Sequence, residues 1–415
     1  MMIVQGILGL AAFVFLAWLM SENRRKVSAR MILTGLGLQL VVGVILLKLS
    51  FFRAIFLHLN KAVTALEQST AAGSSVVFGY LAGGDPPFDV TNPVAVYLFA
   101  FRSLPLVLFM SALSALLFYW KILPAIVRSF SWALQRSMRI GGAEGLGVAA
   151  NVFVGMVEAP LLIRPYLKDM TRSELFAVMT CGMATIAGTV LVLYATMLDA
   201  VIPNALGHIL TASIISAPAA IMIAKIMVPE TGEVTSGKLT SVSEYRSSMD
   251  AITKGAMSGI QLLLSIVAMI IVLVAFVHLI NIILSVIPDA GGRPITLQRL
   301  LGYVMAPAMW LAGVPWGEAA TAGSLMGTKT VLNELIAYFD LSHLEPGALS
   351  DRSRLIVTYA MCGFANPGSL GIMIGGMGAM APERRDEIVA LGFRSIAAGT
   401  IATCMTGAVA GLFMG

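Results

Sequence analysis

Two acidic residues lie in apolar surroundings where a negative charge is costly. Glu158 lies in the segment GMVEAP (155–160), and Glu318 lies in GVPWGEA (313–319). A carboxylate at the centre of a bilayer costs on the order of 2.5–3.5 kcal/mol even on lenient insertion scales, so such a residue usually marks a functional site. Neither segment contains a Lys or Arg. We therefore predict that both carboxylates face a polar chamber, and a structural ion pair is the alternative.

Two further apolar segments contain residues that interrupt a helix. Residues 364–369 (FANPGS) carry a Pro-Gly pair, which breaks helical hydrogen bonding, beside Asn366 and Ser369. Residues 184–189 (ATIAGT) hold the corresponding place in the first half of the chain. Inside a membrane the freed backbone groups must be satisfied by protein, water or ligand. Both breaks are therefore predicted to line a polar cavity.

The first of these breaks also offers oxygen ligands for a cation. Its carbonyl groups and the Thr185 hydroxyl suit a small hard ion such as sodium, and Asn151 adds another oxygen. Helix packing is an equally open interpretation for Thr185 and Asn151 when each is taken alone.

Composition indicates a membrane protein. The chain has 415 residues, of which 58% are hydrophobic and 12% are charged, whereas a soluble domain has about 25% charged residues. Four uncharged stretches are each long enough to cross a bilayer. They cover residues 2–20, 176–198, 259–287 and 355–382. A soluble enzyme is excluded on these grounds.

Basic residues set the expected topology. Residues 2–20 lack a preceding basic region, so we expect a retained first span and not a cleaved signal peptide. The basic cluster at 24–30 follows this span and places that loop in the cytoplasm, with the N-terminus outside. The net charge of +5 comes largely from such short loops, so it predicts orientation and not nucleic-acid binding.

The expected fold is all-α, with eight transmembrane helices and two opposed re-entrant hairpins. The hairpins are predicted at 144–172, entering from the cytoplasmic side, and at 298–338, entering from outside, because their apolar arms are too short to cross. The alternative is that each hairpin is a pair of short spans. The spans are expected at about 2–20, 31–49, 94–119, 174–198, 208–228, 255–287, 352–380 and 388–413.

The two halves echo each other. Glu158 precedes CGMA (181–184) by 23 residues, and Glu318 precedes CGFA (362–365) by 44 residues, a difference that we assign to a longer loop at 338–353. Inverted repeats with broken helices are typical of secondary transporters that bind substrate at the midplane. Chance similarity is the alternative.

The repeat predicts a division of the chain into four parts. They are 1–140 mainly scaffold and interfacial segments, 141–228 first repeat, 229–297 linker and long scaffold helix, and 298–415 second repeat.

Other classes of function find little support in the sequence. It contains no Gly-rich phosphate loop ending in Lys-Ser or Lys-Thr, so ATP-driven transport is not expected. It contains no nucleophile–base pair or metal-binding cluster typical of an enzyme. The three cysteines lie in apolar stretches and are interpreted as packing residues: Cys181, Cys362 and Cys404.

Several motifs together resemble the concentrative nucleoside transporters, and the likeness covers nearly the whole chain. The motifs are NVFVGMVEAP (151–160), ELFAVM (174–179), GVPWGEA (313–319) and CGFAN (362–366). The resemblance implies a homotrimer and an elevator movement of a transport domain against a trimeric scaffold. It also implies coupling to sodium or, less often, to protons. The basic loops and the count of spans place both termini outside, and the short N-terminus predicts a bacterial inner-membrane protein.

The resemblance also implies the site residues. The ribose-binding positions of the family fall on Glu318, Asn366 and Ser369, and Phe364 also matches. The sodium ligands fall on four residues: Asn151, Thr185 and the backbone carbonyls of Val154 and Ile186.

The nucleobase side departs from the family pattern. Many members read Gly-Gln-Thr-Glu where this chain reads Gly155-Met156-Val157-Glu158, while the wall residue Val190 is kept. The function implied is ion-coupled symport that imports nucleosides. Because Met156 and Val157 replace polar base-binding residues, the alternative is another small polar solute or an atypical nucleoside.

Overall fold

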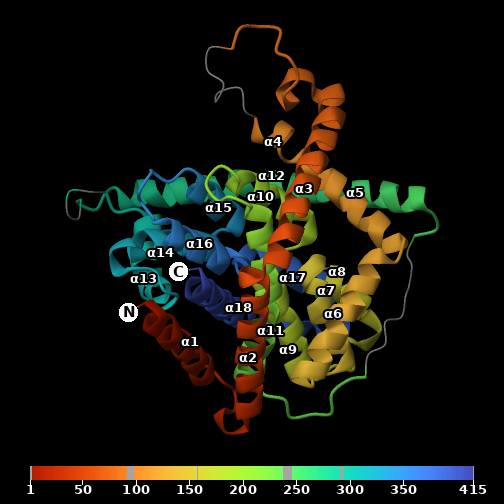
Figure 1. Ribbon diagram of the computed structural model, residues 1–415, viewed down its shortest axis with the longest axis vertical. Coiled ribbons are helices and arrows are strands. Elements are labelled where there is room, and N and C mark those ends of the chain that lie inside the picture. The colour runs from red at the N-terminus through yellow and green to blue at the C-terminus, as the bar shows by residue number, and fades with distance from the viewer. Residues whose placement is uncertain are drawn as a thin grey trace.

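The structure is a computed structural model, and it describes residues 2–90, 98–156, 158–236, 245–289, 292 and 294–414. Within these ranges the chain forms helices joined by turns and loops, with no β-strand (Figure 1). The all-α class predicted from the sequence is therefore confirmed.

The helices follow one another closely. The first half contains α1 (Met2–Leu19), α2 (Ala29–Lys48), α3 (Ser50–Phe78), α4 (Phe99–Arg102), α5 (Pro105–Tyr119), α6 (Ile122–Met138), α7 (Gly142–Phe153), α8 (Glu158–Leu162), α9 (Arg172–Ala184), α10 (Gly188–Leu198) and α11 (Ala205–Met227). The second half contains α12 (Ser248–Leu284), α13 (Leu297–Leu311), α14 (Trp316–Val331), α15 (Glu334–Ser342), α16 (Asp351–Met361), α17 (Pro367–Met380) and α18 (Arg385–Phe413). Short 3-10 turns occur at Arg24–Lys26, Gly79–Ala82, Arg164–Tyr166 and Pro382–Arg384.

The two halves repeat one packing pattern. In the first, α7 packs on α6, α8 and α9, and α11 packs on α9 and α10. In the second, α14 packs on α13, α15 and α16, and α18 packs on α16 and α17. The two repeats meet where α11 contacts α18 at the centre of the molecule. Both α11 and α18 are rich in Ala, Ser and Gly, which lets neighbouring backbones approach closely.

Six helical segments are long and apolar enough to cross a membrane, counted within the described part of the chain. They are Ala29–Lys48, Phe99–Tyr119, Arg172–Leu198, Ala205–Met227, Ser248–Leu284 and Pro382–Phe413. The spans expected at 2–20 and 352–380 correspond to the shorter α1 and to the broken pair α16 and α17. Part of the span expected at 94–119 lies outside the described residues.

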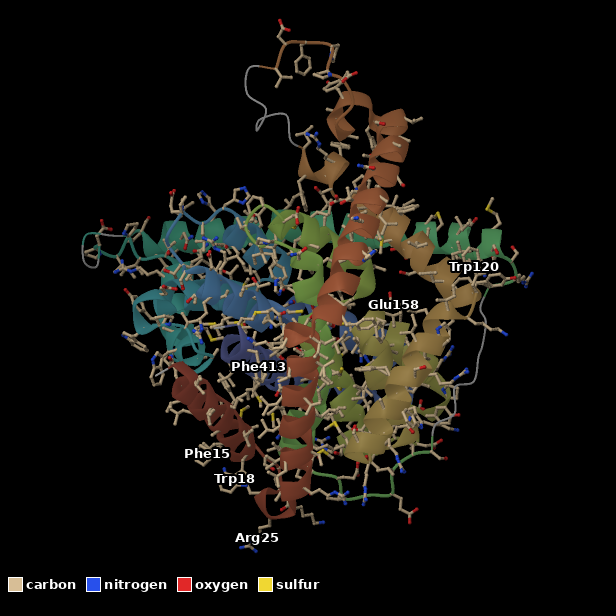
Figure 2. The ribbon with its side chains drawn as sticks, in the orientation of Figure 1. Phe15, Trp18, Arg25, Trp120, Glu158 and Phe413 are labelled. Atoms are coloured by element: carbon tan, nitrogen blue, oxygen red, sulfur yellow. The ribbon has the colours of Figure 1, made fainter. Side chains whose placement is uncertain are left out.

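The two termini lie at the same end of the helical bundle. Gly6 in α1 packs directly against Leu412 near the end of α18. The loop after α1 lies at the other end, where Glu22 pairs with Arg172 and Arg394 at N···O distances of 2.8 and 2.7 Å. Arg25 marks this basic end in Figure 2.

The long helix α12 crosses the molecule beside both repeats (Figure 1). It packs along α5 and contacts α13, but most of its surface is left uncovered. Exposed apolar side chains such as Leu264, Ile271 and Phe276 lie along it. This surface is suited to lipid or to another protein chain.

Candidate functional site

The site begins with two short helices that each start at a glutamate. Glu158 is the first residue of α8 and follows a break after α7, while Glu334 is the first residue of α15 and follows a break after α14. Asn333 caps α15 by accepting a 2.9 Å hydrogen bond from the Ile336 N–H. The two repeats thus place equivalent carboxylates at equivalent breaks.

The Glu334 carboxylate is buried and held by both repeats. Oε1 accepts a 2.7 Å hydrogen bond from the Tyr194 hydroxyl of α10, and Oε2 accepts a 3.1 Å hydrogen bond from Asn366 Nδ2. Asn366 also caps α17, because its Oδ1 accepts a 2.8 Å hydrogen bond from the Ser369 N–H. The helix break predicted at 364–369 therefore positions an amide directly beside the acid.

These groups line a cavity of about 470 Å³ between the repeats and α12. This volume is typical of a small-molecule site. Its polar groups are two carboxylates, amides and hydroxyls, a set that can hydrogen-bond a solute bearing hydroxyl groups. Residues from the repeats that line it include Gly155, Met156, Glu158, Thr189, Val190, Tyr194, Asn333, Glu334, Phe364, Asn366 and Ser369.

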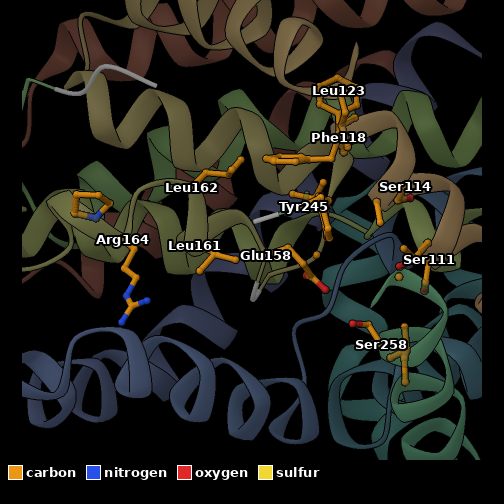
Figure 3. Close-up of a pocket in the computed structure, with 18 residues that line it drawn as sticks. Ser111, Ser114, Phe118, Leu123, Glu158, Leu161, Leu162, Arg164, Tyr245 and Ser258 are labelled. Carbon is orange, nitrogen blue, oxygen red and sulfur yellow. The ribbon is translucent and has the colours of Figure 1, made fainter. Parts of the chain in front are cut away.

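A second cavity of about 330 Å³ adjoins the first. The two share Gly155, Glu158, Thr189 and Leu262 in their walls, so Glu158 stands between them. Figure 3 shows Glu158 pointing towards Ser258 in this second cavity, and Figure 2 shows Glu158 near the mid-height of the molecule. The two cavities therefore lie on either side of the α7–α8 break.

The structure corrects the prediction that Glu318 faces the same cavity as Glu158. Glu318 lies in the first turn of α14, near the turn that joins α13 and α14, and it is not part of either cavity wall. Its Oε2 accepts hydrogen bonds from the Ser350 N–H at 3.1 Å and the Ser350 hydroxyl at 3.0 Å. The physical reason is that free N–H groups at a helix N-terminus favour an acid there.

The acid that the sequence analysis missed is therefore Glu334, together with its partner Tyr194. The number of residues between the glutamate and the following cysteine of each repeat could have identified Glu334. Glu334 precedes Cys362 by 28 residues, close to the 23 residues between Glu158 and Cys181, whereas Glu318 precedes Cys362 by 44. Tyr194 had no comparable signal, because only the folded structure brings α10 against α15.

The predicted cation ligands lie together at the ends of α7 and α9. Thr185, the residue after α9, donates hydrogen bonds of 2.9 Å to the carbonyls of Asn151 and Cys181. Asn151 donates from Nδ2 to the Val178 carbonyl at 3.2 Å, while its buried Oδ1 accepts no hydrogen bond from any described residue. A buried oxygen without a donor is what a bound cation would satisfy.

The remaining predicted ligands lie in the adjoining breaks. Val154 follows α7, and Ile186 lies between α9 and α10, where helical hydrogen bonding stops. Each therefore lies close in the chain to a side-chain ligand, Val154 to Asn151 and Ile186 to Thr185. Sodium prefers such neutral and backbone oxygens.

The predicted base-side residues are partly described. Met156 is buried, and both Met156 and Val190 line the cavity with apolar groups. Gly155 has no side chain to collide with the Glu158 carboxylate, which occupies that space. Val157 lies outside the described residues.

The comparisons with known proteins agree with this architecture. Residues 8–81 and 208–411 match the N-terminal and C-terminal parts of the family described as "Na+ dependent nucleoside transporter", and residues 100–201 match a "Nucleoside recognition" family. The chain is 34% identical to nucleoside permease NupC of Helicobacter pylori, over 99% of this chain and 97% of that protein. It is also 38% identical to the uncharacterized transporter YutK of Bacillus subtilis, over the whole of both chains.

A solved structure shows the same fold. The transporter CNTnw, in an inward-facing substrate-bound state, matches with a TM-score of 0.92 and 34% identity, over 100% of this chain and 98% of that one. The proteins of this family are membrane transporters of nucleosides and not enzymes. The chain is a member of the concentrative, Na+-dependent nucleoside transporter family.

Proposed function

We propose that this protein is a sodium-coupled symporter that imports nucleosides. The observation that carries the proposal is the Glu334 carboxylate, which Tyr194 and Asn366 hold at 2.7 and 3.1 Å in a cavity built from both repeats. A carboxylate beside an amide and the Ser369 hydroxyl suits the vicinal hydroxyls of a ribose. Phe364 supplies an aromatic surface next to them.

The base end of the cavity supports weak base selectivity. Met156 and Val190 offer no hydrogen bonds to a base, so Glu158 and the Thr189 hydroxyl are the polar groups left in that part of the wall. A site that cannot pair with a polar group discriminates poorly between ligands that differ in that group. The same observation favours the second candidate, a transporter of another small polar solute or an atypical nucleoside.

We infer sodium as the coupling ion, with the proton as the alternative. Four residues would hold it: Asn151, Thr185 and the carbonyls of Val154 and Ile186. The support is the buried Asn151 Oδ1 without a donor among the described residues. These ligands are neutral, so they favour a metal cation over a proton, which needs a titratable group.

We further propose a homotrimer with an elevator movement. The long, largely uncovered α12 supplies an apolar surface for contact between subunits. The prediction puts residues 1–140 mainly in the scaffold, but α1 packs on α18 and α2 packs on α11. We therefore assign α1 and α2 to the moving unit, while α5 and α12 remain with the scaffold.

We also propose a bacterial inner-membrane location with both termini outside. Two findings support the orientation. Gly6 packs on Leu412, so the termini share one end. The loop after α1 and the start of α9 place basic residues at the opposite end, which the positive-inside rule assigns to the cytoplasm.

Uptake into proteoliposomes tests the proposal. Labelled uridine and adenosine are supplied with an inward sodium gradient or an inward proton gradient, imposed separately. We expect concentrative uptake with sodium alone. Uptake driven by the proton gradient alone would show that the coupling ion is the proton and not sodium. A competition panel then compares nucleosides with other small polar solutes. If no nucleoside displaces the label, the proposed substrate class is wrong and the second candidate function takes its place.

A further inference from the structure

Lys329 is a fully buried cation for which no hydrogen-bond partner is found. Its side chain is 0% exposed, and Nζ donates no hydrogen bond to any residue that the structure describes. The buried Lys225 of α11 differs, because it lies 3.0 Å from Glu144 and 2.9 Å from Glu230. An isolated buried charge is costly unless the surroundings compensate for it. The position of Lys329 therefore needs an explanation.

The internal repeat provides one. Asn151 is the third residue from the end of α7, and Lys329 is the third residue from the end of α14. Because helix ends are defined only to a residue or two, a second correspondence is needed. Thr185 directly follows α9, and Cys362 directly follows α16. Thr185 donates a hydrogen bond to the Asn151 carbonyl in the first repeat, where α7 packs on α9, and α14 packs on α16 in the same way in the second.

The charges around Lys329 give its ammonium group a role. Glu334 begins α15 only five residues after Lys329, across the break that follows α14, and it is an acid that interacts electrostatically with the ammonium. Lys329 does not approach Glu334 within the 4.0 Å of an ion pair, and the Glu334 oxygens are already engaged by Tyr194 and Asn366. The ammonium therefore balances the charge of Glu334 through space, without blocking the cavity.

We propose that the Lys329 ammonium is a resident cation in the second repeat, at the place that corresponds to the sodium site of the first. This inference rests on the proposed sodium-coupled function. Lys329 is a positioning residue: it acts on substrate through Glu334 and makes a second, exchangeable ion unnecessary. One sodium ion then accompanies each nucleoside, because the other cation position is permanently filled by the protein.

The test compares wild-type protein with Lys329→Met, purified at full length in detergent. Uridine binding is measured while sodium is varied against choline at constant ionic strength. In the wild type we expect a sodium Hill coefficient of about 1. In Lys329→Met we expect uridine affinity at low sodium to fall by about tenfold or more. High sodium should restore the affinity of a second variant, Lys329→Asn, whose shorter side chain offers sodium the amide oxygen that Asn151 offers in the first repeat, with a Hill coefficient that rises towards about 2.

The matched control is Lys225→Met, which removes the other buried lysine. It should lower thermal stability and leave the order of the sodium dependence unchanged. Lys329→Met that binds uridine like the wild type at every sodium concentration would overturn the inference. In Lys329→Asn, a loss of affinity by the same factor at every sodium concentration would overturn it as well, since that is the behaviour of a merely structural residue.

If Lys329→Met is too unstable for binding measurements, its unfolding temperature still tests the charge balance with Glu334. The double variant Lys329→Met with Glu334→Gln removes both charges, and we expect its unfolding temperature to recover towards that of Glu334→Gln alone. A double variant as unstable as Lys329→Met would contradict the counter-charge. If wild-type binding does not depend on sodium, the proposed coupling ion is wrong, and this comparison of stabilities still decides the role of Lys329.

Discussion

The Tyr194 hydroxyl donates a 2.7 Å hydrogen bond to Glu334 Oε1, and this bond joins one repeat to the other. Tyr194 lies on α10 and Glu334 begins α15, so neither repeat alone holds the acid in place. The carboxylate is fixed before a substrate arrives, and this preorganisation lowers the entropic cost of binding.

Glu334→Gln is expected to weaken nucleoside binding strongly. A hydrogen bond to a charged group contributes about 1.5–3 kcal/mol, which corresponds to roughly a 10- to 150-fold increase in Kd. Equilibrium binding of labelled uridine measures it. Glu318→Gln is the control, because Glu318 contacts Ser350 outside the cavity. An equal loss in Glu318→Gln would show that the wrong acid has been assigned.

Tyr194→Phe is expected to raise Kd less, by about three- to tenfold, since it removes one neutral donor worth about 1 kcal/mol. The ring should stay in place against Tyr338, whose centroid is 5.3 Å away. Tyr338→Phe is the matched control, because its hydroxyl donates to the Thr358 carbonyl. Tyr338→Phe should lower the unfolding temperature and leave Kd unchanged. If Kd changes in Tyr338→Phe and not in Tyr194→Phe, the hydroxyl that supports binding is that of Tyr338.

Thr185→Val is expected to raise the sodium concentration needed for half-maximal uptake, by about tenfold or more, because it removes an oxygen next to Asn151. Thr185→Ser keeps the hydroxyl and should stay close to the wild type. The measurement is sodium-dependent uridine uptake into proteoliposomes. Equal sodium dependence in the Val and Ser variants would remove Thr185 from the proposed ion site.

Met156→Gln is expected to increase discrimination between bases, because it places a donor and an acceptor on the apolar side of the cavity. Competition of uridine, cytidine, adenosine and guanosine for labelled uridine gives the four affinities. We expect their spread to widen by about tenfold relative to the wild type. Met156→Leu, which stays apolar, should keep the original spread, and a widened spread in that variant would reject the explanation.

The Glu22 loop is expected to make stability depend on pH at the basic end. A hydrogen bond from Arg172 lowers the pKa of Glu22 despite partial burial. The folded state therefore gains stability from this group above its unfolded pKa of about 4.3, and that gain is lost as pH falls through the lower folded pKa. At neutral pH Glu22→Gln should cost about 0.5–1 kcal/mol, because the pairs are partly exposed.

Thermal unfolding of wild-type protein and Glu22→Gln between pH 7 and pH 3 checks this prediction. The difference in unfolding temperature should shrink towards acid pH. A difference that is constant over the whole range would mean that the Glu22 carboxylate contributes through its shape and not through its charge.

Much of the fold was predictable because helix breaks leave chemical traces. The Pro-Gly pair after Asn366 predicted the break between α16 and α17, and the structure has it there. Apolar length predicted α11 and α18 within three residues at each end, and α12 within seven. These features are local, so the sequence alone carries them.

The helix break of the second repeat was predicted at the wrong place for an equally physical reason. Gly313, with φ of 107°, and Pro315 form an ordinary turn between α13 and α14. That turn resembles a membrane break in composition. The real break before Glu334 contains neither Gly nor Pro, and Asn333 ends it by capping α15. Composition therefore pointed to the turn, while the capping and spacing identify the break.

The wall that α12 contributes to the cavity follows the period of its own helix. Leu262, Ile266, Met269 and Leu273 recur every three or four residues on the side that faces the repeats. A shift of the repeats by one helical turn, about 5.4 Å, therefore brings another apolar side chain to the place of the previous one. If the repeats move along α12 as proposed, the bound solute passes a mainly apolar wall at each position, with Ser265 as a polar side chain among the apolar ones.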